Sequence, residues 1–270
     1  MKKRLFSVKD MDIRDRHGRN LVNRVSLELY ENEFIGIVGE SGSGKTLSVR
    51  AALQLLPQDL NVTYQENEIL GKSFASLSEQ EKRRLLGVDI GFVPQNTVAF
   101  LHPMIKIKHQ MVDAYRVHLK KDKKSALEKA EVLLHKVGIK EPKRVLDSYP
   151  VQLSGGMKQR VNIAMALMTE PKILFVDEPT TALDTVVQKQ VMSVFQDLHV
   201  NEGVSILFIS HDLKLIKRFC NRVYVMFRGE VVETGNTEEV FQQPSHPYTK
   251  KLLGLLPNLN IEKRKSIIKI

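Results

Sequence analysis

Cysteine is nearly missing from this sequence: Cys220 is the only one among 270 residues. One thiol excludes an internal disulfide, and such cysteine usage suits a reducing compartment. We interpret Cys220 as a small buried apolar side chain. The sequence also has no internal repeat and no low-complexity segment.

Long apolar runs are missing too. No run approaches the roughly 20 residues that a membrane-spanning helix needs. The chain starts with basic residues, but Lys9 and Asp10 interrupt any apolar region that a signal peptide would require. We therefore expect any role at a membrane to be peripheral.

Acidic side chains are in the minority, with 31 Asp and Glu against 41 Lys and Arg, giving a net charge of +10. The basic excess is spread thinly, with small clusters only at residues 120–124 and 262–269. Dispersed charge is typical of a solvated surface rather than of a dedicated nucleic-acid interface. The length and the apolar fraction of 42% suit one large domain, or a core with an inserted subdomain.

Short apolar runs indicate buried strands. Residues 34–38, 173–176 and 206–209 are uninterrupted apolar runs apart from Gly36, and residues 5–38 as a whole have strand character. Such runs separated by helical segments are typical of a parallel sheet covered on both faces. The sequence around Arg228-Gly229 predicts a hairpin.

Residues 96–165 are predicted to be largely helical. Leu127, Ala130, Leu134 and Val137 recur with the spacing of an amphipathic helix. From about residue 241 onward, the pattern indicates only a short appended segment.

The run 34–38 leads into a segment that matches Gly-x-x-x-x-Gly-Lys-[Ser/Thr]. Its residues are Gly39, Glu40, Ser41, Gly42, Ser43, Gly44, Lys45 and Thr46. The glycines let backbone N–H groups turn toward phosphate oxygens, and the following helix directs its positive end at the same phosphates. We expect Lys45 to reach the β- and γ-phosphates and the Thr46 hydroxyl to bind Mg²⁺. The pattern alone predicts only a nucleotide-binding protein.

Two carboxylates follow the run 173–176. Asp177 at the end of the strand is placed to hold Mg²⁺. Glu178 is then placed to act as a general base on the water that attacks the γ-phosphate. A polar loop after a strand would give the same local pattern, but the phosphate loop upstream favours the catalytic interpretation.

Residues 153–160, Leu-Ser-Gly-Gly-Met-Lys-Gln-Arg, resemble the signature motif of ABC ATPases. Ser154 is also suited to cap a helix. The order of phosphate loop, signature motif and acidic strand is that of the family. Other segments resemble its further elements: Gln95 the glutamine loop, residues 182–184 the D-loop, and His211 the switch histidine.

The resemblance extends over about residues 5–250 and implies a fold and a site. The expected fold is an α/β P-loop NTPase (RecA-like) core with an N-terminal antiparallel β-subdomain and an inserted helical subdomain at about 96–165. Residues 1–250 would form the ATPase domain and residues 251–270 a C-terminal tail. ATP and Mg²⁺ are the implied ligands, with Thr46, Gln95 and Asp177 at the metal, and Glu178, His211 and Gln95 in catalysis. Ser154, Gly155 and Gly156 would contact the nucleotide bound by a partner subunit.

A finer resemblance points to the oligopeptide, dipeptide and nickel importer branch. It rests on the context of the signature motif from Tyr149 onward, on residues 177–184, and on the segment His-Pro-Tyr-Thr at 246–249. The branch implies membrane permease subunits, a second homologous and non-identical ATPase paired head to tail, and an extracytoplasmic binding protein as an indirect partner. It implies no nucleic acid, and a position at the cytoplasmic face of the membrane.

Two departures from this branch matter. The cysteines that some peptide-transport members carry near the C-terminus are missing, so no iron–sulfur cluster is expected. The aromatic residue that usually stacks on adenine is also missing, and Arg14, Arg16 and His17 occupy that neighbourhood. One of these three residues would have to replace the aromatic, or nothing does; the alternative is that another residue, such as Tyr30, supplies the stack.

Two other function classes compete with the importer ATPase. One is a soluble ABC ATPase that acts on ribosomes or DNA, but such proteins usually carry two ATPase units or a long coiled-coil insertion. The other is a regulatory ATP-binding module without turnover. The complete set of Lys45, Gln95, Asp177, Glu178 and His211 argues against it.

Overall fold

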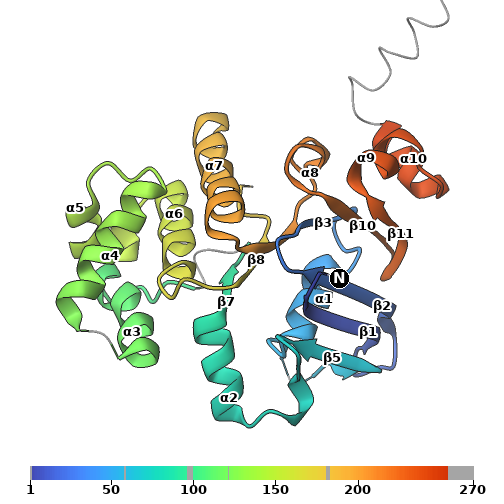
Figure 1. Ribbon diagram of the computed structural model, residues 1–270, viewed down its shortest axis with the longest axis horizontal. Helices are drawn as coiled ribbons and strands as arrows, with labels where there is room; N and C mark the ends of the chain where they lie inside the picture. The colour runs from blue at the N-terminus through green and yellow to red at the C-terminus, as the bar shows by residue number, and fades with distance from the viewer. Residues whose placement is uncertain (1, 58, 96–99, 121, 181–182, 255–270) are drawn as a thin grey trace, which may run out of the picture. The chain divides into compact units, whose positions relative to one another are not determined.

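The computed structural model describes residues 2–57, 59–95, 100–120, 122–180 and 183–254 (Figure 1). The chain folds into two compact units, each assembled from separate stretches of sequence. One unit contains Met1–Lys3, Tyr30–Asn32 and Lys72–Leu207, and the other contains Arg4–Leu29, Glu33–Gly71 and Phe208–Ile270. They are called the helical unit and the loop unit below.

The loop unit begins with an antiparallel sheet. Its strands are β1 (Arg4–Arg14), β2 (Asn20–Tyr30), β4 (Asn61–Thr63) and β5 (Glu66–Ile69). Strand β1 pairs antiparallel with both β4 and β5, and β2 borders its other edge. Val25, Leu27 and Leu29 are fully buried while their neighbours along β2 are more exposed, which confirms the predicted alternation.

The same unit contains a second group of strands. These are β3 (Phe34–Val38), β10 (Arg222–Phe227) and β11 (Glu230–Asn236). Strand β3 is buried throughout and runs parallel to β10, whereas β11 returns antiparallel through the predicted turn at Arg228 (φ 50°) and Gly229 (φ 83°). The last residues of β9 (Ser205–Ile209) also belong to this unit.

The described residues of this unit also form helices. They are α1 (Lys45–Ala52), α8 (Leu213–Phe219), α9 (Thr237–Gln242) and α10 (Pro247–Gly254). A Cβ atom at Gly36 would lie 2.8 Å from the Ile216 Cδ1 atom, so this glycine allows α8 to pack closely on β3.

The described part of the appended segment expected from about residue 241, residues 241–254, belongs to this folded unit. Helix α10 buries Tyr248, Thr249 and Leu253, because its apolar side chains have folded neighbours to pack on. The division into a domain ending at residue 250 and a tail stays a prediction.

The helical unit contains β6 (Lys72–Ser73), β7 (Ile90–Val93), β8 (Ile173–Asp177) and the start of β9. Its helices are α2 (Glu79–Arg84), α3 (Ile107–Leu119), α4 (Lys123–Lys136), α5 (Pro142–Asp147), α6 (Gly155–Ala166) and α7 (Thr185–Glu202). Strand β8 is fully buried and pairs in parallel with β7.

Helices α3 to α6 fill most of the interval predicted to be helical and pack on one another (Figure 1). Ala126, Ala130, Leu133 and Leu134 form the buried stripe of α4, and Val137 is buried just after it. The predicted parallel strands and the inserted helical subdomain are therefore both present in the fold.

Candidate functional site

The segment predicted to be the phosphate loop, residues 39–46, connects β3 to α1. Gly39, Gly42 and Gly44 adopt φ values of 152°, 80° and 99°. A Cβ atom at Gly39 would lie 2.1 Å from the Met226 carbonyl oxygen, so only glycine fits there. The far end of the loop is held by Gly229, whose N–H donates to the Ser43 carbonyl at 3.1 Å.

Lys45 lies at the first position of α1 and is only 5% exposed. Its ammonium donates to the carbonyl oxygens of Gly39 at 2.9 Å and Glu40 at 2.8 Å. A Cβ atom at Gly42 would have no heavy atom within 4 Å, so the loop is open to a ligand on that side. A cation, a helix N-terminus and a turn of backbone amides together fit the phosphates of a nucleotide.

Tyr248, which the sequence predicted only as part of a family motif, contacts this loop. Its hydroxyl oxygen accepts a hydrogen bond from the Glu40 N–H at 2.9 Å, and its ring stacks on Phe227 with the centroids 4.1 Å apart. The residues are 208 positions apart in sequence, so no local pattern could have revealed the contact.

In the helical unit, the structure brings Gln95 and Glu178 together. Strands β7 and β8 pair in parallel, with Val93 opposite Val176. Gln95 and Glu178 each follow these two valines by two positions, so they lie near each other. The Gln95 amide donates to the Glu178 carboxylate at 2.9 Å. Asp177 is 1% exposed at the end of β8.

Glu178 also has an unusual backbone conformation, with φ at 46°. Residues other than glycine adopt positive φ at a cost of order 1 kcal/mol, and such residues concentrate at functional sites. This observation and the contact with Gln95 support a catalytic role for Glu178, which stays a prediction.

The signature motif forms the start of α6. Ser154 caps the helix, with its hydroxyl accepting the Met157 N–H at 3.3 Å, as its sequence suggested. Ser154 and Gly155 are exposed, and a Cβ atom at Gly155 would have no heavy atom within 4 Å. The first turn of a 12-residue helix is therefore accessible to an anion from outside the unit.

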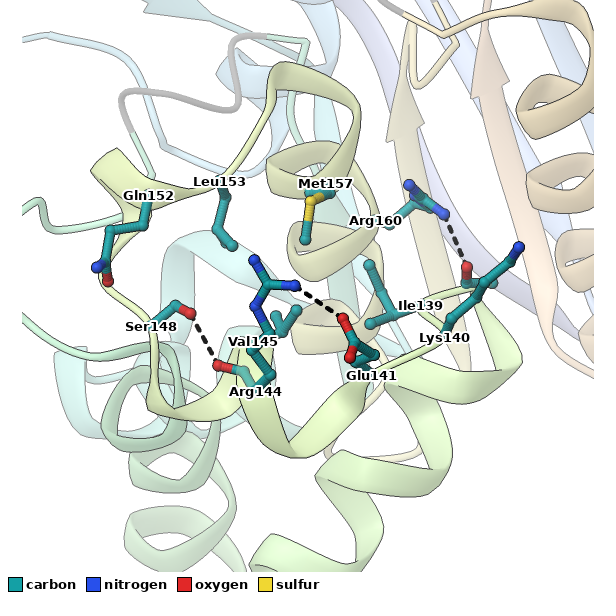
Figure 2. Close-up of a pocket in the computed structure, with 11 residues that line it drawn as sticks. Ile139, Lys140, Glu141, Arg144, Val145, Ser148, Gln152, Leu153, Met157 and Arg160 are labelled. Atoms are coloured by element: carbon teal, nitrogen blue, oxygen red, sulfur yellow. Dashed lines mark hydrogen bonds and ion pairs between the residues drawn. The ribbon is translucent and has the colours of Figure 1, made fainter.

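Arg160 ties this helix start to the preceding helices. Its guanidinium donates to the Gly138 carbonyl at 2.8 Å (Figure 2). It also donates to the Gly156 carbonyl at 3.3 Å. It borders a pocket of about 380 Å³ beneath the motif, which Leu153 and Met157 also line. Because the guanidinium joins Gly138 to Gly156, it holds the position of the signature turn.

The remaining site residues lie at strand ends or helix caps. His211 is exposed two residues beyond β9, in the loop unit. Asp184 caps α7 by accepting the N–H groups of Val186 at 3.0 Å and Val187 at 2.9 Å, whereas Ala182 lies outside the described residues. Residues 39–46 and His211 thus belong to the loop unit, while Gln95, residues 154–156, Asp177 and Glu178 belong to the helical unit.

The segment expected to meet the base forms a polar turn. Asp15 accepts the backbone N–H groups of His17 and Arg19, each at 2.9 Å, and these bonds lower the pKa of Asp15. Arg14, Arg16 and His17 are exposed around it.

Comparison with known proteins decides the family. The model of the ABC transporter family matches residues 22–181. This chain belongs to the ABC transporter family. A second model, the C-terminal region of oligopeptide/dipeptide transporters, matches residues 232–270.

Several characterised members of the family are similar over most of the chain. The dipeptide transport ATP-binding protein DppD of Escherichia coli K12 is 40% identical over 244 residues, covering 90% of this chain and 75% of that protein. The oligopeptide transport ATP-binding protein OppD of Bacillus subtilis is 40% identical over 261 residues, covering 95% and 73%.

Among solved structures, dimeric MJ0796, a bacterial ABC transporter cassette, has a TM-score of 0.77 and 26% identity, covering 86% of this chain and 99% of that one. Together with the family match, this shows the P-loop NTPase fold and makes the chain an ATP-binding, ATP-hydrolysing enzyme. These relatives favour the transport interpretation over a ribosome- or DNA-associated ATPase. No helix in the described part of the chain is both long and apolar enough to cross a bilayer.

Proposed function

We propose that this chain is the ATPase subunit of an importer that takes up peptides, with nickel or another chelated metal as the alternative cargo. The observation that carries the proposal is the match of residues 232–270 to the C-terminal region of oligopeptide/dipeptide transporters. The names of the dipeptide and oligopeptide relatives favour peptides. Cargo is chosen by the permease and the binding protein rather than by the motor.

The residues of this chain have separate roles in ATP hydrolysis. Lys45 and the amides of residues 39–46 hold the β- and γ-phosphates, and Thr46, Gln95 and Asp177 are the residues that would hold Mg²⁺. Bound Mg²⁺ supplies charge neutralisation on the phosphates. Glu178 accepts the proton of the attacking water, with Gln95 orienting its carboxylate. His211 takes the place of the switch histidine that the family resemblance implies.

The exposed start of α6 can contact a nucleotide only if a second ATPase subunit presents one to it. Two ATPase subunits, homologous and non-identical, would pair head to tail, so that Ser154, Gly155 and Gly156 of one contact the nucleotide held by the other. Closure on ATP binding and opening after hydrolysis would then drive permease subunits at the cytoplasmic face of the membrane. The extracytoplasmic binding protein takes part only through the permease.

Reconstitution tests the proposal. The chain, co-expressed with candidate permease subunits and a second ATPase subunit, should co-purify with them and drive ATP-dependent uptake of a dipeptide or of nickel into vesicles. Uptake of neither, or co-purification with ribosomes instead, would contradict the proposal.

We expect the surface that follows Gln95 to contact the permease. Phe100 is 51% exposed and Met104 78% exposed, so large apolar side chains are accessible to a partner on this surface. Cysteines introduced at these two positions should crosslink to a permease subunit in the assembled complex. The one native thiol, Cys220, is buried, so the background is low.

Gln243, exposed just after α9, is the control position for this crosslinking. A cysteine there should give no permease adduct. Capture from Gln243→Cys but not from Phe100→Cys or Met104→Cys would show that the permease binds elsewhere.

We also expect weak discrimination between ATP and GTP. An arginine can stack on a base through its flat face, but with less apolar area than a tyrosine, and contacts to the phosphates do not depend on the base. Competition binding should give an ATP preference below about a hundredfold, or about 2.7 kcal/mol.

The variant Tyr30→Ala separates the alternatives for the adenine site. If Tyr30 supplies the stack, this change should weaken ATP binding, whereas Arg14→Ala should not. A wild-type preference for ATP well above a hundredfold would show a working adenine pocket.

A further inference from the structure

The Gly39–Glu40 peptide at the start of the phosphate loop is held at both ends. Its carbonyl accepts a hydrogen bond from the Lys45 ammonium at 2.9 Å. Its N–H donates to the Tyr248 hydroxyl oxygen, also at 2.9 Å. The two bonds fix the orientation of one peptide plane, so Tyr248 acts on the same group that holds Lys45.

The tyrosine is itself held rigidly. Tyr248 is 6% exposed, and its ring lies nearly parallel to that of Phe227, with an angle of 24° between the planes. Phe227 directly follows Met226, whose carbonyl lies against Gly39. The end of β10 therefore packs against both the loop and the residue that braces it.

The chain before α10 is fixed as well. The Glu233 carboxylate accepts the N–H groups of Ser245 at 2.7 Å and His246 at 3.0 Å. His246 Nδ1 in turn accepts the Tyr248 N–H at 3.2 Å. These bonds place the first turn of α10 so that the Tyr248 hydroxyl meets the loop.

We propose that Tyr248 is a positioning residue for nucleotide binding, whose hydroxyl sets the Gly39–Glu40 peptide that in turn places the Lys45 ammonium. The segment His-Pro-Tyr-Thr at 246–249 thus has a role at the phosphates and is more than a marker of its branch. The inference rests on the proposed binding of ATP by residues 39–46. Burial raises the pKa of Tyr248, so its hydroxyl stays neutral near neutral pH.

The variant Tyr248→Phe removes this hydroxyl and keeps the ring. We expect the Kd for MgATP to rise about three- to tenfold, the change that follows the loss of one partly buried hydrogen bond. The Kd for Mg-pyrophosphate should rise by the same factor, because the loss acts on the phosphate loop and not on the base. In the assembled transporter, KM for ATP should rise with kcat unchanged.

Tyr224→Phe is the matched control. Its hydroxyl oxygen accepts the Glu28 N–H at 3.0 Å and lies 2.6 Å from an Arg222 nitrogen, so it too is a bonded, buried phenol in the same unit. This variant should lose stability to the same extent, but both Kd values should stay within twofold of wild type. Tyr248→Leu, which also removes the stack on Phe227, should bind nucleotide more weakly than Tyr248→Phe.

The same titration separates failure of the inference from failure of the proposed site. If Lys45→Ala loses ATP but Tyr248→Phe binds ATP and pyrophosphate within twofold of wild type, only the role of Tyr248 is overturned. An ATP-specific loss in Tyr248→Phe would overturn it too, because the ring would then act on the base. If Lys45→Ala binds ATP as wild type does, the proposed site fails and the inference fails with it.

Discussion

Replacing Lys45 by alanine is expected to raise the Kd for MgATP by a hundredfold or more. A charge-assisted hydrogen bond contributes about 1.5–3 kcal/mol, and roughly 3 kcal/mol corresponds to somewhat more than a hundredfold. The ammonium also holds the carbonyls of Gly39 and Glu40, so its removal loosens the loop as well. Titration of the purified chain with MgATP measures the change.

Lys217→Ala is the control for this substitution. Lys217 is exposed on α8 in the same unit, and its replacement removes the same charge without touching the loop. Its Kd should equal that of wild type. Equal affinities in Lys45→Ala and wild type would refute the assignment of the phosphate loop.

Glu178→Gln is expected to lower ATP hydrolysis by the assembled transporter at least a hundredfold. A general base contributes about 10²–10⁴-fold, and glutamine cannot accept the proton. A glutamine carbonyl can still accept the hydrogen bond that the Gln95 amide donates at 2.9 Å, so the local geometry should be kept. ATP should still bind, and the subunits should accumulate in the closed dimer.

This experiment needs a defined partner and a matched variant. The second ATPase must carry the equivalent substitution, because its intact site could sustain turnover. Glu141→Gln makes the same chemical change at an exposed residue of the helical unit and should leave hydrolysis unchanged. Normal hydrolysis with both sites changed would mean that Glu178 is not the base.

The structure confirms the sequence predictions that depend on neighbouring residues. The apolar runs at 34–38, 173–176 and 206–209 became the buried strands β3, β8 and β9, because a fully apolar strand is stable only when both its faces are covered. The phosphate loop could be predicted because its glycines and Lys45 lie within eight consecutive residues, 39–46. Ser154 capped α6 for the same local reason.

The contact between Gln95 and Glu178 was predicted only in part from the sequence. Sequence motifs named both residues, but neither motif shows that their side chains meet. The meeting follows from the parallel pairing of β7 with β8, whose register puts Val93 opposite Val176. That register is set by packing across the sheet and by no residue of either motif alone.

The sequence by itself determined the family, and it predicted the nucleotide-binding loop and the buried strands β3, β8 and β9, since these follow from residues close together in the chain. Only the tertiary structure decided the role of residues 241–254, which fold as part of the loop unit instead of extending from it. The bond from the Glu40 N–H to the Tyr248 hydroxyl spans 208 positions. Its existence depends on how β10 and α10 pack together, and packing of distant segments leaves no signal in local composition or periodicity.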